Sequence, residues 1–188
     1  YPMKDRVEPA LRYAAATYIG GPAKGTDGKQ WGASWQSRMY AGNLGLAAWL
    51  VRDELHPDVM ALVKGCVAAE ADRLLAAPPP DMRAGDTKAE ENAWDLTAGS
   101  AALLLMPDHA HARQWREAVI RYAVNSMAVP ADRRSKKGVD GRPLREWATT
   151  AQYYPDFTTE NHGVFHPVYA MVAPATLAQA AVVFRLAG

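Results

Sequence analysis

The chain has 188 residues, which is long enough for one domain with a substantial apolar core. Its 21 Lys and Arg residues nearly balance its 20 Asp and Glu residues, which argues against a basic groove for nucleic acid or an anionic membrane surface. A single cysteine, Cys66, excludes an internal disulfide and a thiolate metal site, and we expect it to be a buried structural thiol. No uninterrupted apolar run reaches the ~18 residues of a membrane span, so the sequence predicts a soluble chain.

Apolar residues recur with a helical period along nearly the whole chain, and no stretch alternates with period two over a useful length. This pattern predicts an all-α protein. A Gly-rich loop at 20–32 and three successive prolines at 78–80 interrupt the helices. Thr87 and Glu90 have the spacing of a helix capping box. Helices are expected at about 7–19, 33–55, 56–77, 88–106, 109–127 and 167–186.

Three segments, 35–51, 91–106 and 166–184, begin polar and aromatic and then become small and apolar. Small residues allow helices to approach closely, so these segments are expected to form inner helices, whereas 60–75 and 112–127 are amphipathic and fit outer helices. Alternating inner and outer helices predict an α/α toroid. Because six hairpins need about twice this length, we expect residues 1–188 to form a single all-α domain that is a partial toroid or a fragment.

Parallel inner helices would place their polar starts on one rim of the toroid, where convergent polar and aromatic side chains predict a binding cleft. Trp faces suit sugar rings, and the polar groups suit hydroxyls and carboxylates. Helix packing is the alternative explanation for the two Trp residues. The expected substrate-binding residues are Trp35, Gln36, Arg38, Asn92, Trp94, Asp95, Glu160 and His166.

The segment 156–169, "DFTTENHGVFHPVY", is the densest cluster of candidate catalytic groups. His162 and His166 have metal-ligand spacing, but Gly163 and Pro167 disfavour a helix there and no third ligand is evident. The sequence therefore predicts no metal site and no cofactor.

Eliminating a uronic-acid glycoside requires three groups: one that neutralises the C6 carboxylate, one that removes the C5 proton and one that protonates the leaving oxygen. Asn161, His162 and Tyr169 supply these residue types, and Glu91 completes the expected catalytic set. Helix capping by the Asn-His pair is the structural alternative.

Two alternatives to a lyase stay open. Glu91 or Asp95 together with Glu160 could form the carboxyl pair of an inverting glycoside hydrolase, although acidic residues at a helix start also favour the helix dipole. The second alternative is a non-catalytic helical module that binds a glycan or serves as a scaffold.

The segments "GDTKAEENAWD" at 85–95 and "ENHGVFHPVYA" at 160–170 resemble those of α/α-toroid polysaccharide-degrading proteins of the heparinase II/III and alginate-lyase type, over about residues 31–188. This resemblance implies charge neutralisation by Asn161, base catalysis by His162 and acid catalysis by Tyr169. It also implies a secreted or cell-surface bacterial protein, although no leader is visible.

The chain departs from such lyases because nothing in it predicts the strands of the β-sandwich that usually follows the toroid. It also begins at Tyr1 without an initiator Met, as a processed or excised piece would. The expected partners are a polysaccharide or oligosaccharide substrate and the missing remainder of a longer chain, with no nucleic acid and no membrane.

Overall fold

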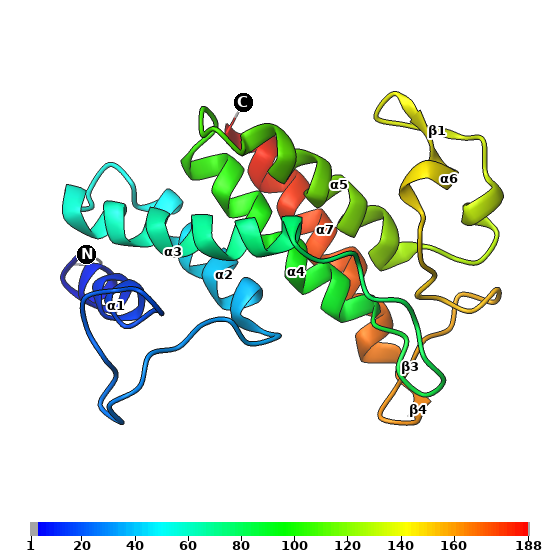
Figure 1. Ribbon diagram of the computed structural model, residues 1–188, viewed down its shortest axis with the longest axis horizontal. Helices are drawn as coiled ribbons and strands as arrows, with labels where there is room; N and C mark the ends of the chain where they lie inside the picture. Colours follow the sequence, from blue (N-terminus) through cyan, green and yellow to red (C-terminus); the bar gives the residue numbers. More distant parts are fainter. Residues whose placement is uncertain (1–3, 188) are drawn as a thin grey trace. The chain divides into compact units, whose positions relative to one another are not determined.

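The computed structural model describes residues 4–187 and is mostly helical, as predicted (Figure 1). Four short strands form two antiparallel hairpins. The elements in chain order are α1 (Lys4–Ala16), α2 (Ser37–Leu50), α3 (Pro57–Leu75), α4 (Ala89–Leu105), α5 (Ala112–Met127), a 3₁₀ turn (Asp132–Arg134), β1 (Gly138–Val139), β2 (Arg142–Pro143), α6 (Leu144–Trp147), β3 (Glu160–Asn161), β4 (Val164–Phe165) and α7 (Pro167–Ala187).

The chain divides into two compact units. The first comprises residues 1–76 and 97–116, and the second comprises 77–96 and 117–188. Helices α4 and α5 each contribute residues to both units. The expectation of a single domain over 1–188 stays a prediction.

In the first unit, small residues let α2 approach α4 closely. A Cβ atom added to Gly42 would lie 2.4 Å from the hydroxyl oxygen of Thr97, which no side chain can tolerate. Apolar residues of α1 and α3 complete this core, and Trp115 of α5 is fully buried within it. The Gly- and Ala-rich half of α2 therefore has the close-packing role that its sequence predicts.

Cys66 lies in the core of the same unit and is 3% exposed. Burial raises the pKa of its thiol to about 12, and the charge of Glu70 acts in the same direction. The thiol is therefore held in its neutral form at physiological pH, which confirms the expected buried cysteine.

The first two helices are shorter than predicted at the ends that face the Gly-rich loop. Helix α1 stops at Ala16 because the chain next pairs with the loop, and the Ile19 N–H donates to the Trp31 carbonyl over 2.8 Å. Helix α2 starts at Ser37 because Ala33 has a left-handed φ of 55°. These long-range pairings override helical propensity.

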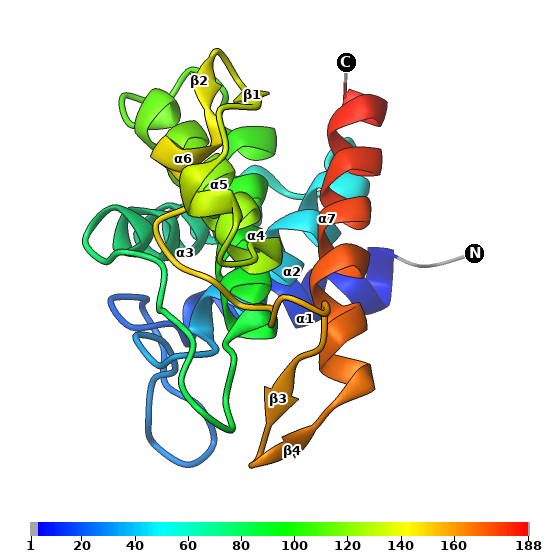
Figure 2. The same cartoon turned by 90° about the vertical axis from the view of Figure 1, so that its right-hand side faces the viewer.

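The second unit also contains two short hairpins that the helical periodicity did not predict. Asp140 and Gly141 have φ values of 47° and 75° and form the turn between β1 and β2. The hairpin of β3 and β4 leads directly into α7 (Figure 2). Strands of two residues are too short to produce a recognisable period-two pattern.

Helix α7 corrects the expectation that no segment has the length and hydropathy of a membrane span. Its 21 residues have a mean hydropathy of 1.5 over the best window, of which only 6% is buried. Val168, Met171, Val182 and Leu186 are exposed apolar side chains on it. Length and composition alone do not show that a helix crosses a membrane, so the finding assigns no membrane role.

Candidate functional site

The predicted catalytic segment forms a tight hairpin in the second unit. Asn161 pairs with Val164, so His162 and Gly163 make a two-residue turn with φ values of 56° and 80°. Positive φ at both central positions matches the strand twist of such hairpins, and His tolerates this region better than most residues. The backbone therefore presents the exposed His162 at the tip of a rigid turn.

The hairpin is docked on the segment that precedes α4. The backbone N–H and the hydroxyl of Thr87 both donate to the Glu160 carbonyl, over 2.8 and 3.1 Å. At the tip, the Gly163 N–H donates to the Gly85 carbonyl over 2.9 Å. Thr87 thus ties together two segments distant in sequence and is not in a capping box with Glu90, which corrects that prediction.

Four rings from the hairpin, α7 and α4 form one cluster. The rings of His166 and Tyr169 have centroids 4.2 Å apart, and the His162 ring lies 6.2 Å from His166 and 6.0 Å from Tyr169. Trp94 meets Tyr169 edge to face, with centroids 6.2 Å apart. The structure therefore brings together two of the residues predicted to be catalytic and two predicted to bind substrate.

His166 stands at the start of α7, in front of Pro167. Its Nδ1 atom accepts the backbone N–H of Tyr169 over 3.4 Å, which caps the helix and leaves any ring proton on Nε2. His162 and His166 do not share a helical face, as Gly163 and Pro167 indicated. They belong to no group of three potential metal ligands among the described residues.

Asn161 points away from solvent, toward the first turn of α4. It is 7% exposed, and its side-chain amide donates to Oε1 of Glu90 over 2.5 Å. Burial raises the pKa of Glu90, and the charges of Glu91 and Asp86 add to this effect, while its own backbone N–H and Lys88 oppose it. Because the pKa of Glu90 is higher in the folded state than in the unfolded state, ionising this group lowers the free energy of unfolding. This loss develops as the pH rises through the folded-state pKa.

Glu91 faces a lysine rather than the rings. The Lys88 ammonium bridges Glu91 and Asp86, with N–O distances of 2.7 and 2.5 Å. Burial lowers the pKa of Lys88, but its bonds to Asp86 and Glu91 outweigh burial and raise that pKa overall. Lys88 also has a left-handed φ of 60°, a conformation that costs about 1 kcal/mol or more in a residue with a Cβ atom.

Glu160 anchors the base of the hairpin. Its Oε2 atom accepts the Tyr154 hydroxyl over 2.6 Å and the Gly85 N–H over 2.9 Å. The bond from Tyr154 is the main cause of a lowered pKa at Glu160. An ionised Glu160 suits a base better than an acid.

Replacing Tyr154 by Phe should raise the pKa of Glu160 toward its ordinary value, because the stronger of the two hydrogen bonds to the carboxylate is lost. The wild-type carboxylate contributes stability above its unfolded pKa of about 4.3, and this contribution is lost as the pH falls through the folded value. The variant should therefore be less stable than the wild type above that pH, and the difference should disappear as the pH falls through the acidic range. Titration of the Glu160 carboxyl carbon by NMR measures the pKa, and an unchanged value would contradict the role given to Tyr154.

Two further predicted residues of α4 are buried. Asn92 is fully buried, and its amide donates to the carbonyls of Pro80 and Lys88, which ties the proline-rich loop to α4. Asp95 is 7% exposed. These placements favour structural roles for both side chains.

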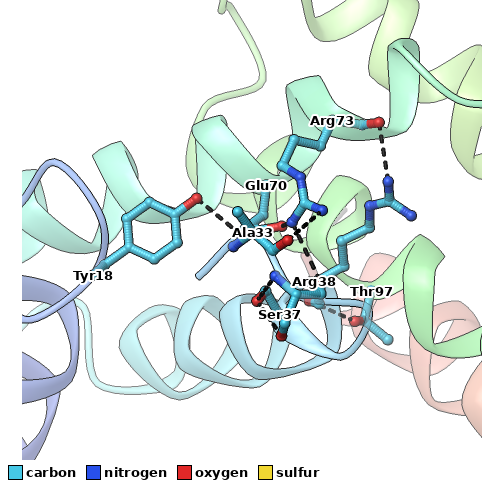
Figure 3. A network of polar contacts seen from close by, with 8 residues as sticks. Tyr18, Ala33, Ser37, Arg38, Glu70, Arg73 and Thr97 are labelled. Atoms are coloured by element: carbon cyan, nitrogen blue, oxygen red, sulfur yellow. Dashed lines mark hydrogen bonds and ion pairs between the residues drawn. The ribbon is translucent and has the colours of Figure 1, made fainter. Parts of the chain in front are cut away.

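The remaining predicted residues belong to the first unit, where a buried carboxylate fixes their loop (Figure 3). Trp35 is 61% exposed, and Gln36 accepts the Tyr40 hydroxyl over 2.8 Å. Arg38 donates to the Arg73 carbonyl over 3.1 Å, and its own carbonyl accepts the Thr97 hydroxyl over 3.2 Å. The predicted cleft would join residues of both units and stays a prediction.

Sequence reasoning missed one feature of the second unit, a cluster of acidic groups before and within the first turn of α4. Carboxylate oxygens of Asp86, Glu90 and Glu91 all lie within 4.8 Å of one another. The helix dipole is enough to explain Glu90 and Glu91 at the start of a helix, and Asp86 lies before the predicted helix. The density of acidic residues in 86–91 was the available signal, because Asp86 precedes α4 and no helical spacing relates it to Glu90 or Glu91.

The second unit thus contains a candidate site in which the His162 imidazole, the Tyr169 phenol and the Trp94 indole lie together. The same unit contains buried carboxyl groups on α4. Comparisons with known proteins add no family to this description. The chain matches no protein-family model, no curated protein and no solved structure.

Proposed function

We propose that the chain is a carbohydrate-active protein, most specifically a polysaccharide lyase that cleaves an acidic glycan by β-elimination. The observation that carries this proposal is the placement of His162 and Tyr169, with ring centroids 6.0 Å apart, next to the half-buried indole of Trp94. An imidazole and a phenol that are close but not hydrogen-bonded to each other suit a base and an acid acting on neighbouring atoms of one sugar residue.

In the proposed reaction, His162 removes the proton from C5 of a uronic acid residue. The electron pair forms a double bond between C4 and C5, the bond from C4 to the glycosidic oxygen breaks, and Tyr169 donates its proton to that oxygen. Trp94 offers an apolar face to the sugar ring, and His166 holds Tyr169 through the start of α7. Asn161 donates a hydrogen bond to Glu90 and so fixes the turn that carries His162. This role is in addition to any hydrogen bond that Asn161 makes to the substrate.

An inverting hydrolase is the second candidate, favoured by the lowered pKa of Glu160. An ionised Glu160 would activate water, and Glu91 or Asp95 would have to act as the acid. Glu91 is paired with Lys88 and Asp95 is buried, so both are less available for that role than Tyr169 is for elimination. A glycan-binding or scaffold module without catalysis is the third candidate.

The toroid arrangement belongs to the same proposal. We infer that α2, α4 and α7 are inner helices of a partial α/α toroid, supported by the close approach at Gly42 in the first unit and the contact of Trp94 with Tyr169 in the second. The proposal includes a secreted or cell-surface location, a glycan substrate and association with further parts of a longer chain.

Incubating the chain with alginate, heparan sulfate and pectic fragments tests the proposal. A lyase generates an unsaturated product that absorbs in the ultraviolet, whereas a hydrolase generates new reducing ends without this absorbance. Glycan binding without either product would favour the binding module, and the absence of binding and of both products would reject all three candidates.

A further inference from the structure

The first turn of α4 contains a buried carboxylate oxygen for which the protein supplies no hydrogen bond. Glu90 is 3% exposed, and Asn161 bonds its Oε1 atom, while its Oε2 atom is buried without a donor. Oδ1 of Asp86 is a second buried oxygen without a donor. A buried carboxylate oxygen without a donor carries a high desolvation cost, so a ligand is expected to satisfy it.

The two residues that carry these oxygens belong to one cluster of acidic groups. Asp86, Glu90 and Glu91 contribute carboxylate oxygens within 4.8 Å of one another. Lys88 bonds the other oxygen of Asp86 and one oxygen of Glu91 but neither of the two oxygens without donors. When all three carboxylates are ionised, as cation binding requires, they and the Lys88 ammonium carry a formal charge of −2, which a divalent cation would neutralise.

We propose that Asp86, Glu90 and Glu91 bind a hard divalent cation, with Ca²⁺ preferred. Oxygen-only ligands select Ca²⁺ or Mg²⁺ over the softer transition metals. Oxygens on opposite sides of one Ca²⁺ lie about 4.8 Å apart, whereas the shorter bonds of Mg²⁺ limit this separation to about 4.2 Å. One carboxylate oxygen from each of the three residues lies within 4.8 Å of the others, so all three can bind a single Ca²⁺ ion.

The position of the cation would serve the proposed reaction. Asn161, which directly precedes His162, bonds Glu90, so the cation would be connected through this side chain to the turn that carries His162. A bound Ca²⁺ would attract the C6 carboxylate of a uronic acid into surroundings that three acidic side chains would otherwise make repulsive. This catalytic role rests on the proposed lyase activity, whereas cation binding itself does not.

Calorimetric titration of the EDTA-treated chain with CaCl₂ tests the inference without any glycan. We expect one site with a Kd on the order of 0.1 mM, together with weaker binding of MgCl₂. Glu90→Gln should weaken Ca²⁺ binding by about tenfold or more, because it keeps the acceptor for Asn161 but removes the charge. Glu146→Gln makes the same chemical change at an exposed position of α6 and should leave the affinity unchanged.

Lys88→Gly provides a test in the opposite direction. It removes the competing ammonium and suits the φ of 60°, so Ca²⁺ affinity should rise by about tenfold. Absence of Ca²⁺ binding in the wild-type chain would overturn the inference, as would equal affinities for the wild type and Glu90→Gln. An unchanged or weaker affinity in Lys88→Gly would also overturn it, because the cation would then lie elsewhere.

The two proposals fail separately. Ca²⁺ binding without glycan cleavage would reject the lyase and retain the cation site. Glycan elimination that persists in EDTA, with no Ca²⁺ binding, would reject the cation site and retain the lyase.

Discussion

Replacing His162 by Asn should lower the rate of glycan β-elimination by about 10²–10⁴-fold, the range typical of losing a positioned general base. Asn cannot take a proton near neutral pH, whereas imidazole can. The choice of Asn matters because position 162 has a φ of 56°, which Asn adopts readily and Ala does not. The substitution therefore removes the base and preserves the turn.

Initial rates from the ultraviolet absorbance of the unsaturated product measure this effect. His162→Gly, which also suits the positive φ, should lose as much activity as His162→Asn and remain folded by circular dichroism. His56→Asn in the first unit is a matched control, because its side chain is exposed and distant in sequence, and it should keep wild-type activity. Wild-type rates in His162→Asn would remove His162 from the role of base.

The helices could be predicted because their apolar faces repeat over many residues. The predicted range 88–106 differs from α4, Ala89–Leu105, by one residue at each end.

The strands could not be found by periodicity, but their turns carried a local signal. Asp140 before Gly141 is a strong hairpin dipeptide, and His162 before Gly163 is a weaker one.

The candidate site was predictable in its chemistry and only partly in its geometry. His162, His166 and Tyr169 are close in sequence, and the tight turn and the start of α7 keep their rings close in space. The burial of Asn161 against Glu90 could not be inferred, because it depends on how two segments 71 positions apart dock. Hydrogen-bond partners of polar residues are set by tertiary packing, and one sequence does not encode them in any local pattern.

Glu70 shows the same limit within the first unit, because it lies on an amphipathic helix where an acidic residue usually faces solvent. In the structure it is fully buried. Its Oε1 accepts the Tyr18 hydroxyl over 2.9 Å and the Ala33 N–H over 3.1 Å, and its Oε2 accepts Arg73 over 2.6 Å (Figure 3). The loop leading to Trp35 is thereby attached through one carboxylate to Tyr18, which follows α1, and to α3.

Replacing Glu70 by Ala should lower the free energy of unfolding by about 3 kcal/mol or more, because three hydrogen bonds to one charged, buried group are lost together. Burial and the charge of Glu70 raise the pKa of Tyr18, so Tyr18 stays a neutral phenol and would keep a buried hydroxyl without its acceptor. Urea denaturation at neutral pH measures the loss as a lower midpoint at constant slope.

Two further variants distinguish the effect of losing the hydrogen-bond network from the effect of losing a charge alone. Glu54→Ala removes an exposed carboxylate from the same unit and should change stability by less than about 0.5 kcal/mol. Glu70→Gln keeps the volume and an acceptor oxygen, so its loss should lie between those of the two Ala variants. If Glu70→Ala were no more destabilising than Glu54→Ala, the carboxylate would not hold the loop. If instead Glu70→Ala is strongly destabilising and also weakens glycan binding as much as Trp35→Ala does, the network serves to present Trp35.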